Sequence, residues 1–383
     1  MDPFNSRFIL NEKRWLWIDY DKGISIILVG YGHCFSILQY RGVNLADYPA
    51  FNYFGVFFFG FRMPLFFIVS GLLVARSLNK KKLKGYVSDR INNILYPLFV
   101  WGFLQVTLQL ITAHFTHNTV SPVNYLNLLI NPRETEQFWY LNALFFIGVI
   151  YAFFRAVVKL TPLMQVALGF ILYSISAYLH IHVVSVHIFN TDFGFLTDVF
   201  EFYIFFAIGD LISKIALDEK NIQKFSSWKV FVPLLVIFVI IQYYFTELNL
   251  KPNPEEAYYV EHKLPFFFLL EALVGCTLSV SFSFLLQKHR TLTFLRIVGF
   301  HSLFIYCMQI IVMTIARTVF MSVLHITYVP ALILLVWSSG IILPIFFYNF
   351  CLKYNLWWLY TFRKPERQVE YMKATNIFSL KKA

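Results

Sequence analysis

Apolar stretches long enough to cross a lipid bilayer recur along the whole of this chain. A membrane-spanning helix needs about 17–25 predominantly apolar residues. Only 14% of the 383 residues are charged, whereas a typical soluble domain has about a quarter. The sequence therefore predicts an all-α, polytopic membrane protein of about ten transmembrane helices in one bundle over residues 1–352. The predicted spans are 23–40, 51–75, 94–112, 138–154, 163–181, 196–213, 229–246, 265–286, 297–324 and 329–352.

The charges between these spans predict which way the chain runs. With the N-terminus in the cytoplasm, alternate loops on that side carry 26 Lys and Arg, and the outer loops carry 4. Cytoplasmic loops of membrane proteins show such an excess, so both termini are expected inside, with residues 353–383 as a basic tail. The same bias accounts for the net charge of +11 without nucleic acid as a partner. The run RSLNKKKLKGYVSDR (76–90) is expected to be a cytoplasmic loop near anionic headgroups.

Two ionisable residues of the first span stand eleven positions apart. At 100° per residue, Lys22 and His33 point to one face of a helix, about 16 Å apart along its axis. Lys22 would then lie at the cytoplasmic end and His33 near mid-membrane. An ionisable group at that depth faces the bundle interior or a cavity. Gly30 and Gly32 beside His33 would let a helix or a ligand come close.

Four blocks of sequence carry a resemblance to a known family. RWLWIDYDKGISIILVGYGH (14–33) combines a basic residue, Gly-Ile, and a His eleven positions after the basic residue. FRMPLFFIVSGLL (61–73), FWYLNALFF (138–146) and GFHSLFIYCMQ (299–309) follow in order. Together they resemble acyltransferase family 3, the integral-membrane O-acyltransferases of bacterial surface polysaccharides. The chain is most similar to the fucose O-acetylase-like branch.

Two positions depart from the pattern of that family. The family often has His immediately before Met-Pro and at the end of the late block, where this chain has Arg62 and Gln309. The roles of those histidines therefore cannot be carried over unchanged. Arg62 stands about 21 Å along the second span from Arg76 at its inner end. At that depth a cation either snorkels, pairs with a carboxylate, or stabilises the oxygen of a thioester as charge develops there.

The resemblance implies an enzyme with two substrates. An acetyl or similar short acyl group, with succinyl as an alternative, would move from cytoplasmic acetyl-CoA to a hydroxyl of a lipid-linked or surface-glycan sugar. Acetyl-CoA would be a co-substrate, with no bound cofactor, in a multi-pass protein of the bacterial inner membrane. His33 would act as general base or be acylated transiently itself. The alternative class is a transporter or flippase that uses the same intramembrane charges.

The remaining candidate residues divide by the side of the membrane they would face. Lys22 and Arg14 at the inner mouth would bind the phosphates of CoA, or serve only as positive-inside anchors. Sugar hydroxyls would be bound from the outer halves of later spans, where structural ion pairs and aromatic packing are the alternatives, by Trp139, Tyr140, Glu201, Glu271 and Arg317. A shared cavity would also be faced by Asp19, Ser302, Tyr306 and Gln309. No metal site is expected, because HIHVVSVH (180–187) has no acidic or Cys partner beside it.

Overall fold

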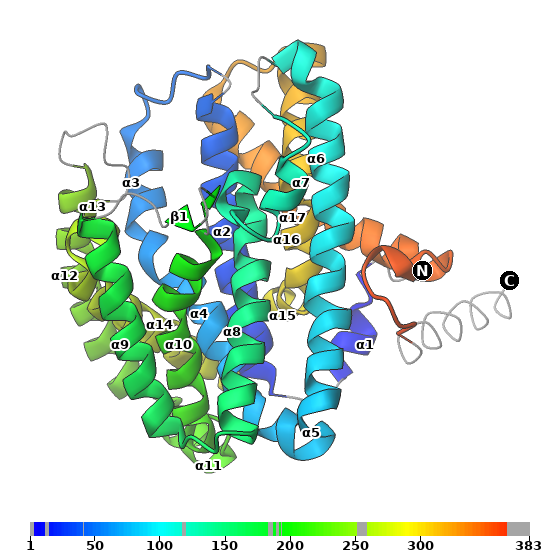
Figure 1. Ribbon diagram of the computed structural model, residues 1–383. Helices are drawn as coiled ribbons and strands as arrows, with labels where there is room; N and C mark the ends of the chain where they lie inside the picture. Colours follow the sequence, from blue (N-terminus) through cyan, green and yellow to red (C-terminus); the bar gives the residue numbers. More distant parts are fainter. Residues whose placement is uncertain are drawn as a thin grey trace, which may run out of the picture.

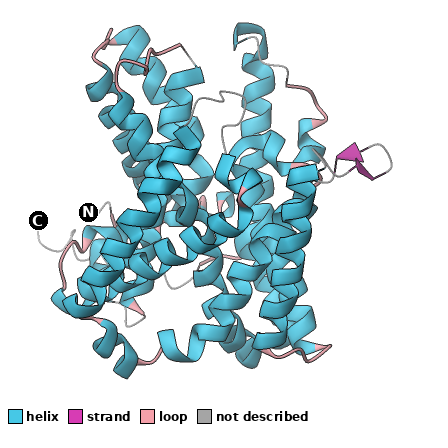
Figure 2. Ribbon diagram, turned by 90° about the vertical axis from the view of Figure 1, so that its left-hand side faces the viewer, coloured by secondary structure: helices cyan, strands magenta, loops and turns pink. Residues whose placement is uncertain are grey.

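Helices account for almost all of the computed structural model, which describes residues 4–11, 15–40, 42–116, 120–182, 187–188, 191–192, 194–250 and 259–365 (Figures 1 and 2). The first half holds α1 (Ser6–Asn11), α2 (Leu16–Tyr40), α3 (Pro49–Phe57), α4 (Phe59–Leu72), α5 (Val74–Arg90), the π-helical turn η1 (Ile91–Leu95), α6 (Tyr96–Thr116), α7 (Asn124–Asn127), the 3₁₀ segment η2 (Pro132–Phe138), α8 (Trp139–Ala156) and α9 (Pro162–His182).

The second half begins with a short antiparallel pair, β1 (His187–Ile188) and β2 (Thr191–Asp192). It continues with α10 (Gly194–Ala216), α11 (Glu219–Phe225), α12 (Trp228–Leu250), α13 (Tyr259–Lys263), α14 (Pro265–His289), α15 (Phe294–Phe300), α16 (Ser302–Thr318), the π-helical turn η3 (Val319–Val323), α17 (Val329–Lys353) and the 3₁₀ turn η4 (Trp357–Leu359).

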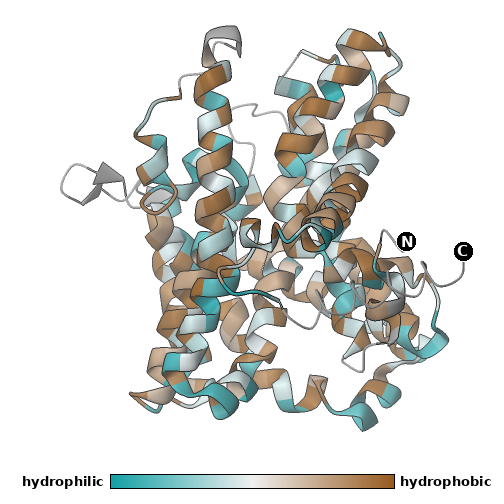
Figure 3. Ribbon diagram, turned by 90° about the vertical axis from the view of Figure 1, so that its right-hand side faces the viewer, coloured by the Kyte–Doolittle hydropathy of each residue, from teal (hydrophilic) through white to brown (hydrophobic). Residues whose placement is uncertain are grey.

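The prediction of a polytopic helical membrane protein is confirmed. Within the described residues, nine helical stretches are long and apolar enough to cross a membrane, and they cover nine of the ten predicted spans. The tenth, 196–213, coincides with the 23-residue α10, which carries too many charges to count as an apolar span. It lies inside the bundle, packed against α4, α8 and α9. Brown, apolar residues run along the lengths of the helices in Figure 3, as a lipid environment requires.

Three local expectations need correction. The span predicted at 51–75 is two helices, because the backbone leaves the helical region at Phe58 between α3 and α4. The span predicted at 297–324 divides in the same way into α15, α16 and η3. The predicted loop at 76–90 is the helix α5, interrupted only at Lys82. This segment packs on α8, where the buried Tyr86 lies with its hydroxyl 3.1 Å from a methyl group placed on Gly148.

The two ends of the bundle can be told apart. Helices α5 and α11, which the loop charges assign to the cytoplasm, lie at the same end of the molecule, whereas α3 and α13 lie at the opposite end (Figure 1). We call these the inner end and the outer end. After α17 the chain returns to the bundle, where Tyr360 is buried with its ring 5.2 Å from that of Trp101. Residues 366–383, most of the predicted tail, lie outside the described residues.

The first and the last of the four sequence blocks meet at one helix crossing. Gly299 of α15 lies so close to α2 that a methyl group there would overlap the carbonyl oxygen of Asp19 and stand 2.9 Å from the backbone nitrogen of Gly23. Gly23 in turn faces the Leu295 carbonyl. Such close approach between membrane helices depends on small residues. The crossing fixes α2, and therefore His33, relative to the second half of the chain.

We predict that Gly299→Ala destabilises the protein, because backbone atoms on α2 cannot move aside as a side chain can. The expected loss is about 1–3 kcal/mol, typical of an overpacked contact. Thermal unfolding in detergent measures it. Gly55→Ala in α3 is the matched control, because the nearest atom to its added methyl group, on the Tyr31 ring, is 3.4 Å away. Equal melting temperatures for the two variants would contradict the proposed crossing.

Candidate functional site

A cavity of about 180 Å³ brings together several of the residues that the sequence singles out. Four predicted candidates line it: His33, Arg62, Trp139 and Tyr306. The other polar lining residues are Ser36, Arg133 and Glu261, and the apolar ones include Val29, Phe59, Met63, Pro64, Phe202 and Phe268. Most of these residues come from the parts of α2, α4, η2, α10, α13 and α14 that are nearest the outer end. The cavity therefore lies in the outer half of the bundle.

Helix α2 brings His33 to the cavity wall. Ser36 follows one turn later and lines the same space, as residues three apart on a helix do. On the other side of α2, Trp337 Nε1 of α17 donates a 3.0 Å hydrogen bond to the Ile27 carbonyl, and Cys34 is fully buried. This packing holds the helix, so the imidazole is presented from a fixed backbone.

The guanidinium of Arg62 lies directly against α2. A methyl group on Gly32 would overlap its Nη1 atom and stand 2.8 Å from Nη2. Nη1 donates a 3.2 Å hydrogen bond to the Leu28 carbonyl, and the group lies 4.7 Å over the ring of Phe59. The bare backbone at Gly32, one residue before His33, thus creates the space that the cation occupies. Arg62 and His33 line the same cavity.

Arg62 is therefore placed on the bundle interior and not on the lipid face. The carbonyl of the same residue accepts a 2.6 Å hydrogen bond from Ser25 Oγ on α2. Contacts from both the side chain and the backbone of Arg62 thus join α4 to α2. The prediction that His33 and Arg62 face one cavity agrees with this geometry.

Arg133 of η2 forms the wall of the cavity opposite His33 and Arg62. Acidic residues stand behind its guanidinium. Its Nε donates a 2.7 Å hydrogen bond to Asp198 Oδ1, and its Nη2 lies 3.7 Å from Glu201 Oε2. The guanidinium also covers the ring of Trp139 at 4.8 Å. Glu261 of α13 lines the cavity beside it. This wall therefore combines a cation, a carboxylate and an aromatic ring.

Tyr306 closes the inner side of the cavity. Its hydroxyl donates to the Gln137 carbonyl, and its ring lies 5.2 Å from that of Tyr140. Tyr140 itself is buried behind Tyr306 and does not line the cavity. The predicted Tyr140 contact with a ligand would therefore need a rearrangement, whereas Trp139 and Tyr306 are already at the surface of the cavity.

Two predicted acceptor residues, Glu201 and Glu271, stand behind the cavity wall. Glu271 of α14 is fully buried, accepts a hydrogen bond from Gln242 Nε2, and packs against Gly60, whose backbone lines the cavity. Glu201 backs Arg133 as described above. Both positions support residues that face the cavity without facing it themselves.

The other predicted site residues lie away from the cavity. Lys22 is half-buried on α2, eleven residues towards the inner end from His33. Asp19 and Ser302 are buried near the crossing of α2 and α15. The Gln309 amide is fully buried beside Gly30, and Arg317 donates to Thr318 Oγ1 near the outer end of α16. Arg14 lies outside the described residues.

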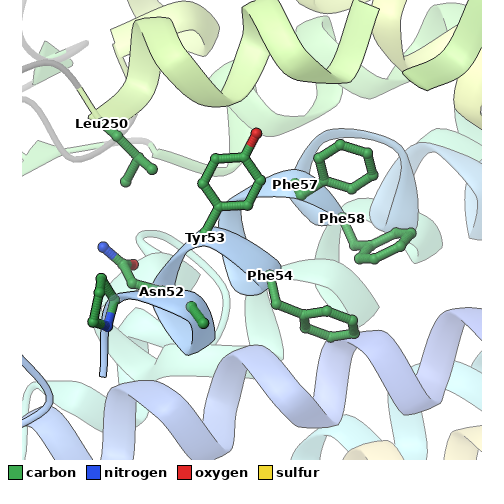
Figure 4. A pocket seen from close by; sticks show the side chains of 8 residues that line it. Asn52, Tyr53, Phe54, Phe57, Phe58 and Leu250 are labelled. Atoms are coloured by element: carbon green, nitrogen blue, oxygen red, sulfur yellow. The ribbon is translucent and has the colours of Figure 1, made fainter. Parts of the chain in front are cut away.

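A larger hollow lies on α3, near the outer end of α12. It has a volume of about 750 Å³ and is lined by Pro49, Ala50, Asn52, Tyr53, Phe54, Phe57, Phe58 and Leu250 (Figure 4). Among the described residues, this lining holds no imidazole, carboxylate or cation. A hydrocarbon surface of that kind suits lipid chains. The smaller cavity, with its ionisable groups, is the better candidate for chemistry.

Sequence reasoning missed Arg133 and Glu261. Both lie in short elements, η2 and α13, that the hydropathy pattern assigns to outer loops. Their signal was the position of each charge directly before a span, where a side chain can turn back into the bundle. Within the described residues, no group of three or more His, Cys, Asp and Glu could hold a metal ion. The site thus offers one imidazole beside one cation, with polar groups opposite.

Comparison with known proteins assigns this chain to a family. A model of an acyltransferase domain matches residues 15–362. Nodulation protein NolL of Sinorhizobium fredii is 29% identical over 152 residues, which are 39% of each chain. Nodulation protein NolL of Mesorhizobium japonicum is 34% identical over 101 residues, 26% of each chain. The alignments thus cover well under half the length of these curated relatives, and no solved structure matches.

The family match extends over nearly the whole of the described bundle and includes all the residues that line the cavity. It confirms the resemblance inferred from the four sequence blocks. It also favours an enzyme over the alternative of a transporter or flippase. The chain belongs to the family of membrane acyltransferases.

Proposed function

We propose that the protein transfers an acetyl or similar short acyl group from acetyl-CoA to a hydroxyl of a lipid-linked or surface-glycan sugar. The observation that carries the proposal is the shared cavity of His33 and Arg62 in a chain of this family. A base and a fixed cation in one cavity are what acyl transfer to a hydroxyl requires. The bacterial inner membrane is the proposed location.

In this mechanism His33 handles the proton. Its neutral imidazole takes the proton of the sugar hydroxyl as the oxygen attacks the thioester carbonyl carbon. The new C–O bond forms, the C–S bond breaks, and the imidazolium returns the proton to the departing thiolate. In a route through transiently acylated His33, an imidazole nitrogen first attacks the thioester and the thiolate leaves. The sugar hydroxyl then attacks the acyl carbon, the C–N bond breaks, and the hydroxyl proton passes to the thiolate.

Arg62 stabilises the negative charge that develops on the carbonyl oxygen. Its guanidinium lines the cavity, with Nη1 donating to the Leu28 carbonyl. Its position against Gly32 keeps it beside the imidazole before the substrate arrives. A charge fixed in this way costs little reorganisation during the reaction.

The donor is proposed to enter from the inner end. CoA carries its phosphates at one end and its thiol at the end of a long, thin arm, so a cytoplasmic cation can bind the phosphates while the acetyl group reaches the cavity. Lys22, on the inner part of α2, keeps this proposed role, and Arg14 is proposed to share it. The acceptor is proposed to approach from the outer end, near which Arg133, Trp139 and Glu261 line the cavity.

We predict that His33→Ala abolishes acyl transfer without unfolding the protein. Loss of a general base typically lowers the rate by about 10²–10⁴-fold. Release of free thiol from acetyl-CoA by purified protein, with a sugar acceptor present, measures the rate. His289→Ala is the matched control, because His289 is exposed at the inner end of α14. Near-normal turnover by His33→Ala would remove the imidazole from the mechanism.

Gly32→Ala tests whether the position of Arg62 matters. The added methyl group displaces the end of a flexible side chain, so the fold should survive while the guanidinium moves away from the imidazole. We expect kcat to fall towards that of Arg62→Gln, for which a loss of about 10²–10³-fold is typical of an oxyanion donor. Gly30→Ala is the control, because its nearest contact would be 3.5 Å. Equal kcat values for Gly30→Ala and Gly32→Ala would argue against the arrangement.

Lys22 should be replaceable by Arg but not by Glu, since the proposed role is a positive charge at the inner mouth. The effect of Lys22→Glu should be a higher KM for acetyl-CoA with the KM for the acceptor unchanged. Steady-state kinetics with each substrate varied in turn separates the two constants. If the donor KM of Lys22→Glu equals that of the wild type, Lys22 acts only as a topological anchor.

A further inference from the structure

The wall of the cavity opposite His33 holds a charged pair that the reaction itself does not use. Arg133 keeps 41% of its side-chain surface open, whereas its partner Asp198 keeps only 1% and Glu201 only 4%. The two carboxylates therefore stand behind the guanidinium, and the guanidinium faces the cavity. Glu261 lines the cavity next to it.

The backing residues give this wall a defined charge. Asp198 neutralises Arg133 through the 2.7 Å hydrogen bond to Nε. Glu201 also stands behind the guanidinium, and Glu261 lines the cavity beside it, so this wall holds three carboxyl groups and one guanidinium.

The geometry points to Arg133 and Glu261 as a two-point subsite for the hydroxyls of an uncharged sugar. This inference rests on the proposed function and adds the chemical class of the acceptor. A sugar hydroxyl can donate to the Glu261 carboxylate while a neighbouring hydroxyl accepts from the guanidinium. Trp139 lies beneath the guanidinium and fixes its plane at 4.8 Å.

The same wall disfavours an anionic sugar. A carboxylate on the acceptor would meet the Glu261 carboxylate on this wall, and the one cation of the wall, Arg133, is already paired with Asp198. Like charges brought together in this way select against the wrong partner. The subsite should therefore take neutral sugars in preference to uronic acids.

Direct binding tests the inference without turnover. The probes are the methyl glycoside of a neutral hexose and the methyl glycoside of the matching uronic acid, added to purified full-length protein and measured by saturation-transfer NMR titration. We expect the wild type to bind the neutral glycoside at least tenfold more tightly than the uronide. Absence of this preference, or no binding of the neutral glycoside, would overturn the inference.

The variant Glu261→Gln tests the role of Glu261 itself. Replacing a charged acceptor by a neutral one should weaken binding of the neutral glycoside about tenfold and reduce the preference over the uronide. Glu247→Gln, an exposed residue on α12, is the matched control and should bind as the wild type does. If Glu261 only holds α13 in place, the variant would lower the melting temperature but keep the wild-type preference, and the inference would be wrong.

The outcome also separates this inference from the proposed function. If wild-type protein shows the predicted preference but releases no thiol from acetyl-CoA, the subsite stands and the proposed acyl transfer fails. If thiol is released but the glycosides bind equally well, acyl transfer stands and the subsite fails. Binding by Glu261→Gln and Glu247→Gln is measured below the melting temperatures of both variants, so a reduced preference in Glu261→Gln supports the assignment of Glu261 and a wild-type preference overturns it.

Discussion

A charge inside a bilayer has to find its partners within the protein, because lipid offers none. This constraint determines where the polar residues of the bundle can lie. It explains how α10 can occupy a predicted span with several charges: Asp198 meets Arg133 at 2.7 Å, and Asp210 meets Arg155 at 3.5 Å and accepts from Tyr151 at 2.7 Å. It also explains why Arg62 packs on the backbone of α2 instead of facing lipid.

Hydropathy predicts much of this fold because each membrane span satisfies its own backbone. The nine apolar spans and His33 follow from stretches of sequence that can be evaluated one at a time. The break at Phe58 does not, since α3 and α4 together read as one apolar run. The helix α5 was missed for the opposite reason: its lysines indicate a loop, and its helical form depends on the packing of Tyr86 against the bundle.

Prediction of the site from the sequence has the same limit. A side chain at the depth of His33 or Arg62 is costly in lipid, so depth alone marks both as candidates. Arg133 and Glu261 are not marked, because at the edge of a span a charge is ordinary. Only the fold shows that η2 and α13 turn these two residues into the cavity. Depth in the membrane also marks Glu201 and Glu271 as candidates, but both stand behind the cavity wall. Burial alone does not reveal which side of that wall a residue occupies.

The replacement of a family histidine by Arg62 has a consequence for the proton. A guanidinium stays protonated throughout the accessible range, so Arg62 can stabilise charge but cannot accept a proton from a substrate. In the proposed mechanism, the proton leaving the hydroxyl and the proton reaching the thiolate therefore both pass through His33. One base then serves both half-steps, and acceptor and thiol must stand within reach of the same imidazole. A cavity of about 180 Å³ is small enough to keep acceptor and thiol close to one imidazole. It would suit two separated bases less well.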